Sequence, residues 1–318
     1  MTTSAIQAIR QIDTENIEAL GRFHLNKNRD YTQFQRGKFK ANATEITLNQ
    51  AQILRESFNL GTRIEATPAD CFLPFAVVMP HSSDYQFCGQ QAQGNPFLQA
   101  SGGTWEVHSQ QRLDYVATVF LREHFIKSYH SLTGREPNSN VISSRMAQTS
   151  SQLQWQYARQ VLEVTQQLLV QPSLLADDNI QRMVCAHLLR LTIDIVNDSL
   201  ALPEPLTRHN KRQQGVTRVV EFLRENAHLL PDITQLCDIA QLSERSLQYG
   251  FKEKYGVTPV QYLRLIRLNG AHKALLNADK STTTVAQIAL NWGFVEFGRF
   301  SRDYKSLFEQ LPSQTLIS

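Results

Sequence analysis

Two stretches near the end of the sequence combine cations, hydrogen-bonding groups and aromatic side chains at helical spacing. On a helical wheel of residues 243–254, the polar side chains on one side are Arg245, Gln248, Tyr249 and Lys252. Arg and Gln carry paired hydrogen-bonding groups that match the edges of guanine and adenine in the major groove. Lys252 lies further along the helix and is better placed for a phosphate. This face has the chemistry to contact nucleic acid.

The second stretch, residues 297–308, has the same two-sided character. Its apolar side carries Phe300, Tyr304 and Leu307. Its outward side carries Gly298, Ser301, Arg302 and Lys305, with Arg299 on the flank. A glycine on the outward side would allow the helix backbone to approach a base pair closely, although glycine lowers helix propensity. The aromatic residues therefore anchor the expected helix, and the cations face a polyanion.

Both stretches belong to an internal repeat within residues 215–318. The second copy follows the first by 52 residues before the turn and by 53 after it. Each copy opens with a capping signal, Asp232 with Gln235 and Thr284 with Gln287. One amphipathic helix with outward cations is usually only a solvated surface helix. Two copies with matching caps and turns predict a pair of helix-turn-helix elements.

A longer helix is expected between the two copies. Thr258 is a suitable N-cap, and Pro259 suits the first helical position. The apolar positions that follow extend the helix to residue 277, a length of about 28 Å. We expect this linker helix to join the two reading elements.

The remainder of the chain suggests a second domain. The chain has 318 residues, of which 42% are hydrophobic and 19% charged, as in ordinary soluble globular proteins. Residues 207–318 carry 15 Lys and Arg against 10 Asp and Glu, although the net charge of the whole chain is only +3. A basic C-terminal third suggests an anionic partner. Because we find neither a membrane-spanning stretch nor a secretion signal, we expect a cytoplasmic protein without membrane contact.

Short alternating runs between about residues 30 and 125 predict strands of a small barrel or sandwich; they are GKFKANATEITL, AQILRESF, CFLPFAVVM, GGTWEVHS and DYVATVFL. From about 147 to 200 the spacing changes to that of two helices, broken by the QPS at 171–173. Residues 201–214 have linker composition. We therefore expect an α+β multidomain chain, with a first domain over 1–200, a linker over 201–214 and an all-α domain over 215–318.

Few residues of the first domain point to a specific site. The four cysteines form no CxxC pair, and the histidines show no metal-binding spacing, so neither a disulfide framework nor a metal site is expected. Arg55 and Arg63 either line a barrel mouth for a polar ligand or pair across a hairpin. Trp105 is either barrel core or a platform for a ligand. These three residues are the candidates for effector binding.

The C-terminal third resembles the paired helix-turn-helix domain of AraC/XylS-type transcription regulators over about 100 residues. The motifs that carry the resemblance are the GVTP at 256–259, the IRL at 266–268 and the IALNWGF at 288–294. The ending WGF…F…DY…LF…PSQTL is most similar to the subgroup that contains the ethanolamine-utilisation operon regulator. Most of the family has glycine after the final Phe, whereas this chain has Glu309.

The resemblance implies that two recognition helices enter successive major-groove segments of double-stranded DNA. The implied base-reading residues are Arg245, Gln248, Tyr249, Gly298, Arg299 and Arg302. The implied phosphate contacts are Ser243, Lys252, Ser301 and Lys305, together with the helix starts at Ile233 and Val285. It also implies a cupin-like β-barrel sensor, a small-molecule effector in place of a cofactor, a homodimer and, for an activator, contact with RNA polymerase.

These observations favour a ligand-responsive transcription regulator, an activator rather than an enzyme. Two alternatives stay open. A DNA-binding protein with an enzymatic N-terminal domain would need a reactive cysteine, Cys71 or Cys88, in an electropositive setting. A non-specific DNA organiser would bind random DNA as tightly as any chosen site.

Overall fold

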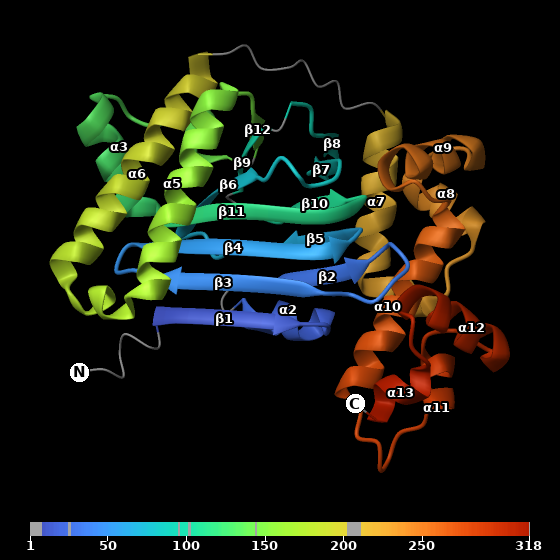
Figure 1. Cartoon of the computed structure of the whole chain (residues 1–318). Coiled ribbons are helices and arrows are strands. Elements are labelled where there is room, and N and C mark those ends of the chain that lie inside the picture. Colours follow the sequence, from blue (N-terminus) through green and yellow to red (C-terminus); the bar gives the residue numbers. More distant parts are fainter. Residues whose placement is uncertain are drawn as a thin grey trace. The chain divides into compact units, whose positions relative to one another are not determined.

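The computed structural model describes residues 8–24, 27–94, 96–100, 103–143, 145–201 and 211–317 (Figure 1). The described residues divide into two compact units by their contacts. The first unit takes its residues from 1–31 and 39–205, and the second from 32–38 and 206–318.

The first unit is built on a seven-stranded sheet with the order β1-β3-β4-β11-β6-β9-β12. Its strands are β1 (Ile9–Thr14), β3 (Ala41–Thr47), β4 (Ala51–Leu60), β11 (Gln111–Leu121), β6 (Phe72–Val78), β9 (Phe97–Gln99) and β12 (Arg145–Ala147). Neighbouring strands pair antiparallel, as in Arg55 opposite both Thr44 and Val116. This register sets which side chains of β3, β4 and β11 share a face.

A second sheet of five strands has the order β2-β5-β10-β7-β8. Its strands are β2 (Arg29–Gln33), β5 (Thr62–Ala66), β10 (Trp105–Ser109), β7 (Tyr85–Phe87) and β8 (Gln90–Gln91). The five runs read as strands from the sequence correspond to β3, β4, β6, β10 and β11, so those predictions are confirmed. The sequence reading missed the other strands, several of which have only two or three residues and carry too little alternation to be recognised.

Two apolar cores lie on opposite faces of the seven-stranded sheet. Leu54 and Phe58 of β4 point into the core shared with the second sheet, whereas Ile53 belongs to the core on the outer face. This separation follows from the two-residue period of a strand. The outer-face core is completed by helices.

The helices of the first unit are α2 (Ile17–Phe23), α3 (Arg122–Thr133), α4 (Ser139–Ile142), α5 (Ser151–Val170) and α6 (Asp178–Ala201). A 3₁₀ turn at Pro172–Ala176 separates α5 from α6, which confirms the predicted break. Figure 1 shows α5 and α6 side by side across one end of the seven-stranded sheet. Buried Tyr157 and Val161 of α5 and Leu188 of α6 join the outer-face core.

The second unit is helical. Its helices are α7 (Lys211–Asn226), a 3₁₀ turn (Ala227–Leu229), α8 (Ile233–Ala240), α9 (Glu244–Tyr255), α10 (Pro259–Asn277), α11 (Val285–Asn291), α12 (Phe297–Phe308) and α13 (Pro312–Ile317). Helix α10 covers the residues predicted for it. Helix α7 begins at Lys211, so the last four residues of the predicted linker are helical. Residues 202–210 of that linker lie outside the described residues.

Two cores lie along α10. Its first half packs with α7, α8 and α9 through Tyr262 and Leu263, and its second half packs with α11, α12 and α13 through Leu268 and Leu275. Trp292 packs against both cores. Residues 32–38 also belong to this unit: the main-chain N–H of Gln33 donates to the Asn269 side chain over 2.8 Å.

Candidate nucleic-acid interface

The first helix-turn-helix pair is held by local hydrogen bonds that the sequence predicts. The Asp232 carboxylate accepts from the main-chain N–H of Gln235, and the Gln235 side chain accepts from the N–H of Asp232 in return. Ser243 caps α9 by accepting from the N–H of Ser246. Between them, Gln241 ends α8 in the left-handed region with φ of 53°. These contacts fix where α9 starts and which way it faces.

The inward and outward faces of α9 agree with the predicted wheel. Leu247 and Phe251 are fully buried. The outward residues are all exposed; they are Ser243, Arg245, Gln248, Tyr249 and Lys252. An exposed tyrosine beside exposed cations is available to bases and phosphates.

Two of these side chains are already oriented by neighbours. The Arg245 guanidinium lies 5.6 Å from the centre of the Tyr249 ring. The Gln248 amide donates to the Glu244 carboxylate over 2.9 Å. The carbonyl oxygen and one N–H of the Gln248 amide are not used in this hydrogen bond.

The second pair repeats the architecture with different residues at several positions. Thr284 and Gln287 form a capping box at the start of α11. Gly293 adopts φ of 77°, as expected for the turn. A Cβ at Gly293 would overlap the tip of the exposed Leu230 side chain, so a larger residue requires Leu230 to move. The cap of α12 is Glu296, which makes no side-chain capping bond.

The outward face of α12 is cationic. Gly298, Arg299, Arg302 and Lys305 are exposed, and Ser301 is half-buried. On the inward face Phe300, Tyr304 and Leu307 are buried. The only acidic residue within α12, Asp303, pairs with Arg264 of α10 and so does not oppose the outward cations. The face retains an excess of positive charge for phosphates.

Arg264 helps to hold α12 in place, a role that the sequence analysis did not assign to it. Its ion pair with Asp303 ties α12 to α10. Burial, and next the charge of Arg299, lower the pKa of Arg264. The available signal was the position of Arg264 on the predicted long helix, but a partner in a different helix cannot be read from spacing.

The phosphate candidates at helix starts, Ile233 and Val285, are the first residues of α8 and α11. In both helices the capping box already occupies the amide at the third position.

The three effector-binding candidates are not brought together. Arg55 lies on the outer face of the seven-stranded sheet and lines a cavity of about 730 Å³ beside α5. Arg63 is buried and forms ion pairs with Glu65 of its own strand (2.6 Å) and with Glu106 of β10 (2.9 Å). It is therefore not a surface residue that pairs across a hairpin, because no hairpin joins β5 to β10. Trp105 is buried in the core between the two sheets, which agrees with the core alternative.

Glu56 is the neighbour of Arg55 in sequence but faces the opposite side of β4. It is fully buried between the sheets, 2.7 Å from His24 Nε2 and 2.9 Å from Arg29. The Tyr115 hydroxyl donates to it over 3.0 Å. Burial alone would raise the pKa of Glu56, but His24 and Arg29 outweigh burial and lower it to about 2. The two-residue period of β4 was the signal that separates Glu56 from Arg55.

Residues 236–317 match the family described as Helix-turn-helix domain. Over 103 residues the chain is 39% identical to the probable thc operon regulatory protein of Rhodococcus erythropolis, covering 32% of this chain and 31% of that protein. Over 99 residues it is 37% identical to the XylDLEGF operon transcriptional activator 2 of Pseudomonas putida, covering 31% of this chain and 63% of that protein. The match therefore spans less than two thirds of either curated relative.

A solved structure of a probable AraC family transcriptional regulator from Rhodopseudomonas palustris is 34% identical and 94% covered, with 32% of this chain matched and a TM-score of 0.30. Residues 236–317 thus form a helix-turn-helix domain, and the regulators described above are what this part of the chain is similar to. The matched region begins within α8 and contains α9 to α13, and thus both recognition-helix candidates.

The similar proteins are transcription regulators and not enzymes, in agreement with the prediction for this chain. Within the described ranges, no helix is long and apolar enough to cross a membrane. The same residues contain no group of three or more His, Cys, Asp or Glu placed to hold a metal ion.

Proposed function

We propose that the protein is a sequence-specific DNA-binding transcription regulator, an activator controlled by a small-molecule effector bound in its first unit. The observation that carries the proposal is the presence of two capped helix-turn-helix pairs, each with an exposed polar and cationic face on its second helix. Such faces suit the major groove, where phosphate contacts position the protein and base contacts specify the site.

The proposed base-reading residues are Arg245, Gln248 and Tyr249 of α9 and Gly298, Arg299 and Arg302 of α12. Their exposure supports this assignment, because a base-reading side chain must leave the protein core. Ser243, Lys252, Ser301 and Lys305 are proposed for phosphates. Gly298 has open space around its Cα, so the backbone of α12 can come close to a base pair.

The division of labour is also a proposal. Residues 1–200 would form a cupin-like sensing and dimerisation domain, 201–214 the linker, and 215–318 the DNA-binding domain. Activation, through RNA polymerase, is supported by the name of the XylDLEGF operon activator. Similarity to the ethanolamine-operon subgroup stays a prediction, since the two relatives described above are named for other operons.

The decisive experiment selects binding sites for the full chain from a pool of random duplexes and then measures competition. We expect one enriched sequence with two conserved blocks about one helical turn apart, and random competitor DNA should displace it poorly. Displacement by random duplex at the same concentration as the selected site would instead favour the non-specific organiser.

A further inference from the structure

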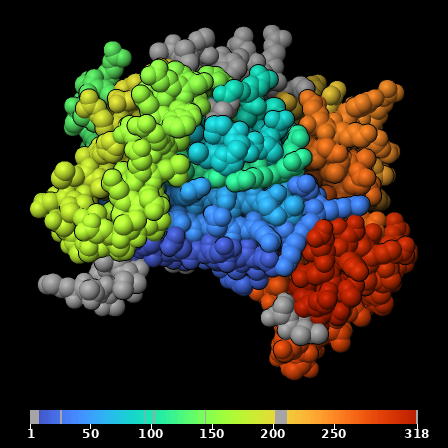
Figure 2. Space-filling view, viewed as in Figure 1, coloured from blue at the N-terminus to red at the C-terminus, as the bar shows by residue number. Residues whose placement is uncertain are grey.

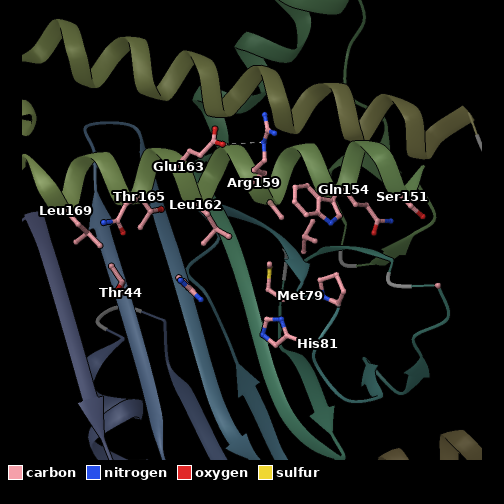
Figure 3. A pocket seen from close by; sticks show the side chains of 17 residues that line it. Thr44, Met79, His81, Ser151, Gln154, Arg159, Leu162, Glu163, Thr165 and Leu169 are labelled. Atoms are coloured by element: carbon pink, nitrogen blue, oxygen red, sulfur yellow. Dashed lines mark ion pairs between the residues drawn. The ribbon is translucent and has the colours of Figure 1, made fainter.

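The cavity beside α5 is formed by the outer face of the sheet and one flank of the helix (Figure 3). Across the sheet, the register places Thr44, Arg55, Val116 and Val77 in one row on β3, β4, β11 and β6. Side chains in such a row share a face. Figure 2 shows α5, in yellow-green, over one end of the sheet, with the blue strands uncovered beside it. The cavity thus lies where helical cover of the sheet stops.

Most of the cavity wall is apolar. Leu162 and Leu169 point from α5 toward the strands, with Met79 below Leu162 and Thr44 below Leu169 (Figure 3). Trp155 lines the same cavity and is 61% exposed. The volume of about 730 Å³ falls within the range of small-molecule sites, and such sites are mostly apolar with a few placed polar groups. Such a wall suits a ligand with an apolar body.

The polar end of the cavity is positively charged. Arg55 and His81 line it, and both contact buried Asp114, at 3.5 Å and 2.9 Å. Arg112 approaches the same carboxylate at 3.9 Å. Two guanidinium groups thus share one carboxylate, which leaves an excess positive charge beside the half-exposed Arg55. The other charged residues of the wall, Arg159 and Glu163, pair with each other at 3.3 Å.

We propose that this cavity binds a carboxylic acid with an apolar body, the carboxylate on the Arg55 guanidinium and the body between α5 and the sheet. Guanidinium and carboxylate form charge-assisted hydrogen bonds that a neutral or cationic head group cannot make. That such a ligand is the effector rests on the proposed function. Binding itself does not, because it is measured without DNA.

The first test is calorimetry on the full chain with three probes that share one apolar body: 4-phenylbutyrate, 4-phenylbutanamide and 4-phenylbutylamine. A probe of this size should bind with a Kd of about 1 mM or tighter. We expect the acid to bind at least about tenfold more tightly than the amide, and the amine least. Equal binding of acid and amide, tighter binding of the amine, or no binding of the acid at several times that concentration would overturn the proposal.

The second test uses variants and the acid probe. Arg55→Gln removes the charge and Leu162→Trp fills the apolar part, and each should weaken binding about tenfold or more. Arg190→Gln is the matched control, because Arg190 lies on α6 in an i,i+4 pair with Asp194 and outside the cavity. Binding retained by both cavity variants, or lost equally in the control, contradicts the site.

A second copy of the chain is the competing occupant of the cavity. Analytical ultracentrifugation, which measures the oligomeric state, distinguishes it from a small-molecule ligand. If the native chain is a dimer that Leu162→Trp converts to a monomer while the acid probe fails to bind, the groove is a protein interface. If the probe binds as expected but no DNA sequence is selected, the cavity stands and the proposed function fails.

Discussion

Both helix-turn-helix pairs have a residue with left-handed backbone after the first helix and another after the second. Glycine occupies a different one of these two positions in each pair. After the first helix, the first pair has Gln241 with φ of 53° and the second has Gly293 with φ of 77°. After the second helix, the first pair has Gly256 with φ of 71° and the second has Glu309 with φ of 56°. These positions correspond through the repeat offsets of 52 and 53 residues.

Each pair therefore carries one residue that tolerates this backbone and one that is strained by it. A non-glycine residue in the left-handed region costs roughly 1–2 kcal/mol. The repeat thus conserves backbone conformation while the residue types vary. Glu309 stands where most of the family has glycine, and the structure keeps the left-handed turn there at the expense of strain.

The pairs also differ in their cores. The first is built on Phe251, Tyr255 and Tyr262, whereas the second contains His272, which stacks on Phe308 with ring centres 4.2 Å apart. Among the described rings of these two cores, a histidine therefore stacks on an aromatic ring only in the second. The two pairs should respond differently to acid.

The largest effect is expected for Gly293→Gln, which gives the second turn the residue of the first. Left-handed strain and overlap with Leu230 together should cost about 3 kcal/mol of unfolding free energy. Hydrogen exchange of the α11 and α12 amides in the full chain measures it. Gly298→Gln, at an open helical position, is the control; an equal loss in both would refute the turn explanation.

Arg302→Ala should weaken binding to the selected DNA site by about 1–3 kcal/mol and relax the preference at one base pair. The reason is that Arg302 is exposed on the outward face of α12 and offers a bidentate donor to guanine. Binding curves on the site and its single-base variants provide the measurement. A uniform loss on every sequence would reassign Arg302 to phosphate.

Acid should loosen the second pair before the first. Burial, and next Lys273, lower the pKa of His272 from 6.5 to about 4. Between pH 4 and 6.5, His272 binds more protons in the unfolded chain than in the folded chain. The contribution of neutral, buried His272 to the free energy of unfolding is therefore fully present above pH 6.5 and is lost as the pH falls. The loss should reach about 2 kcal/mol at pH 5.

Local hydrogen exchange of α12 against α9 is the appropriate readout, because His24 in the first unit also has its pKa lowered to about 4. His272→Phe should remove the difference between the two helices. A difference that persists in this variant would assign the acid response to another group.

Glu309→Gly should stabilise the second pair by about 1 kcal/mol, since glycine adopts the left-handed cap without strain. The reciprocal change Gly256→Glu should destabilise the first pair by a similar amount. No neighbouring atom lies near that position, so left-handed backbone strain is the only cost of the new side chain. Chemical unfolding of both variants beside the native chain gives the comparison. A loss of stability in Glu309→Gly would mean that the carboxylate makes a compensating contact.

The smallest effect is expected for Lys305→Ala. If Lys305 contacts a phosphate, every DNA sequence should bind slightly more weakly, and the salt dependence should fall by about one unit of slope. Affinities at several salt concentrations test it, with Arg302→Ala as the sequence-specific contrast. An unchanged slope removes Lys305 from the interface.

Much of the second unit was predictable because its signals are local. Capping boxes at Asp232 and Thr284, the turn at Gly293 and the helical spacing of Phe300 and Tyr304 each involve residues within one or two turns. The first unit was less predictable. Strands β7 and β8 are too short to show alternation, whereas β1, β9 and β12 lie outside the alternating runs and pair with strands that are distant in sequence.

The sequence by itself determined the repeat, the caps and the two-sided recognition helices, because each is a relation between neighbouring residues. Only the tertiary structure decided that Arg63 forms buried ion pairs and that Trp105 packs in the core between the sheets. It also decided that Glu56 is buried with Arg29 and that Arg55 lines a cavity against an apolar flank of α5. These last relations join elements far apart in the chain. Burial and cavity shape depend on how those elements pack, and no local spacing encodes that packing.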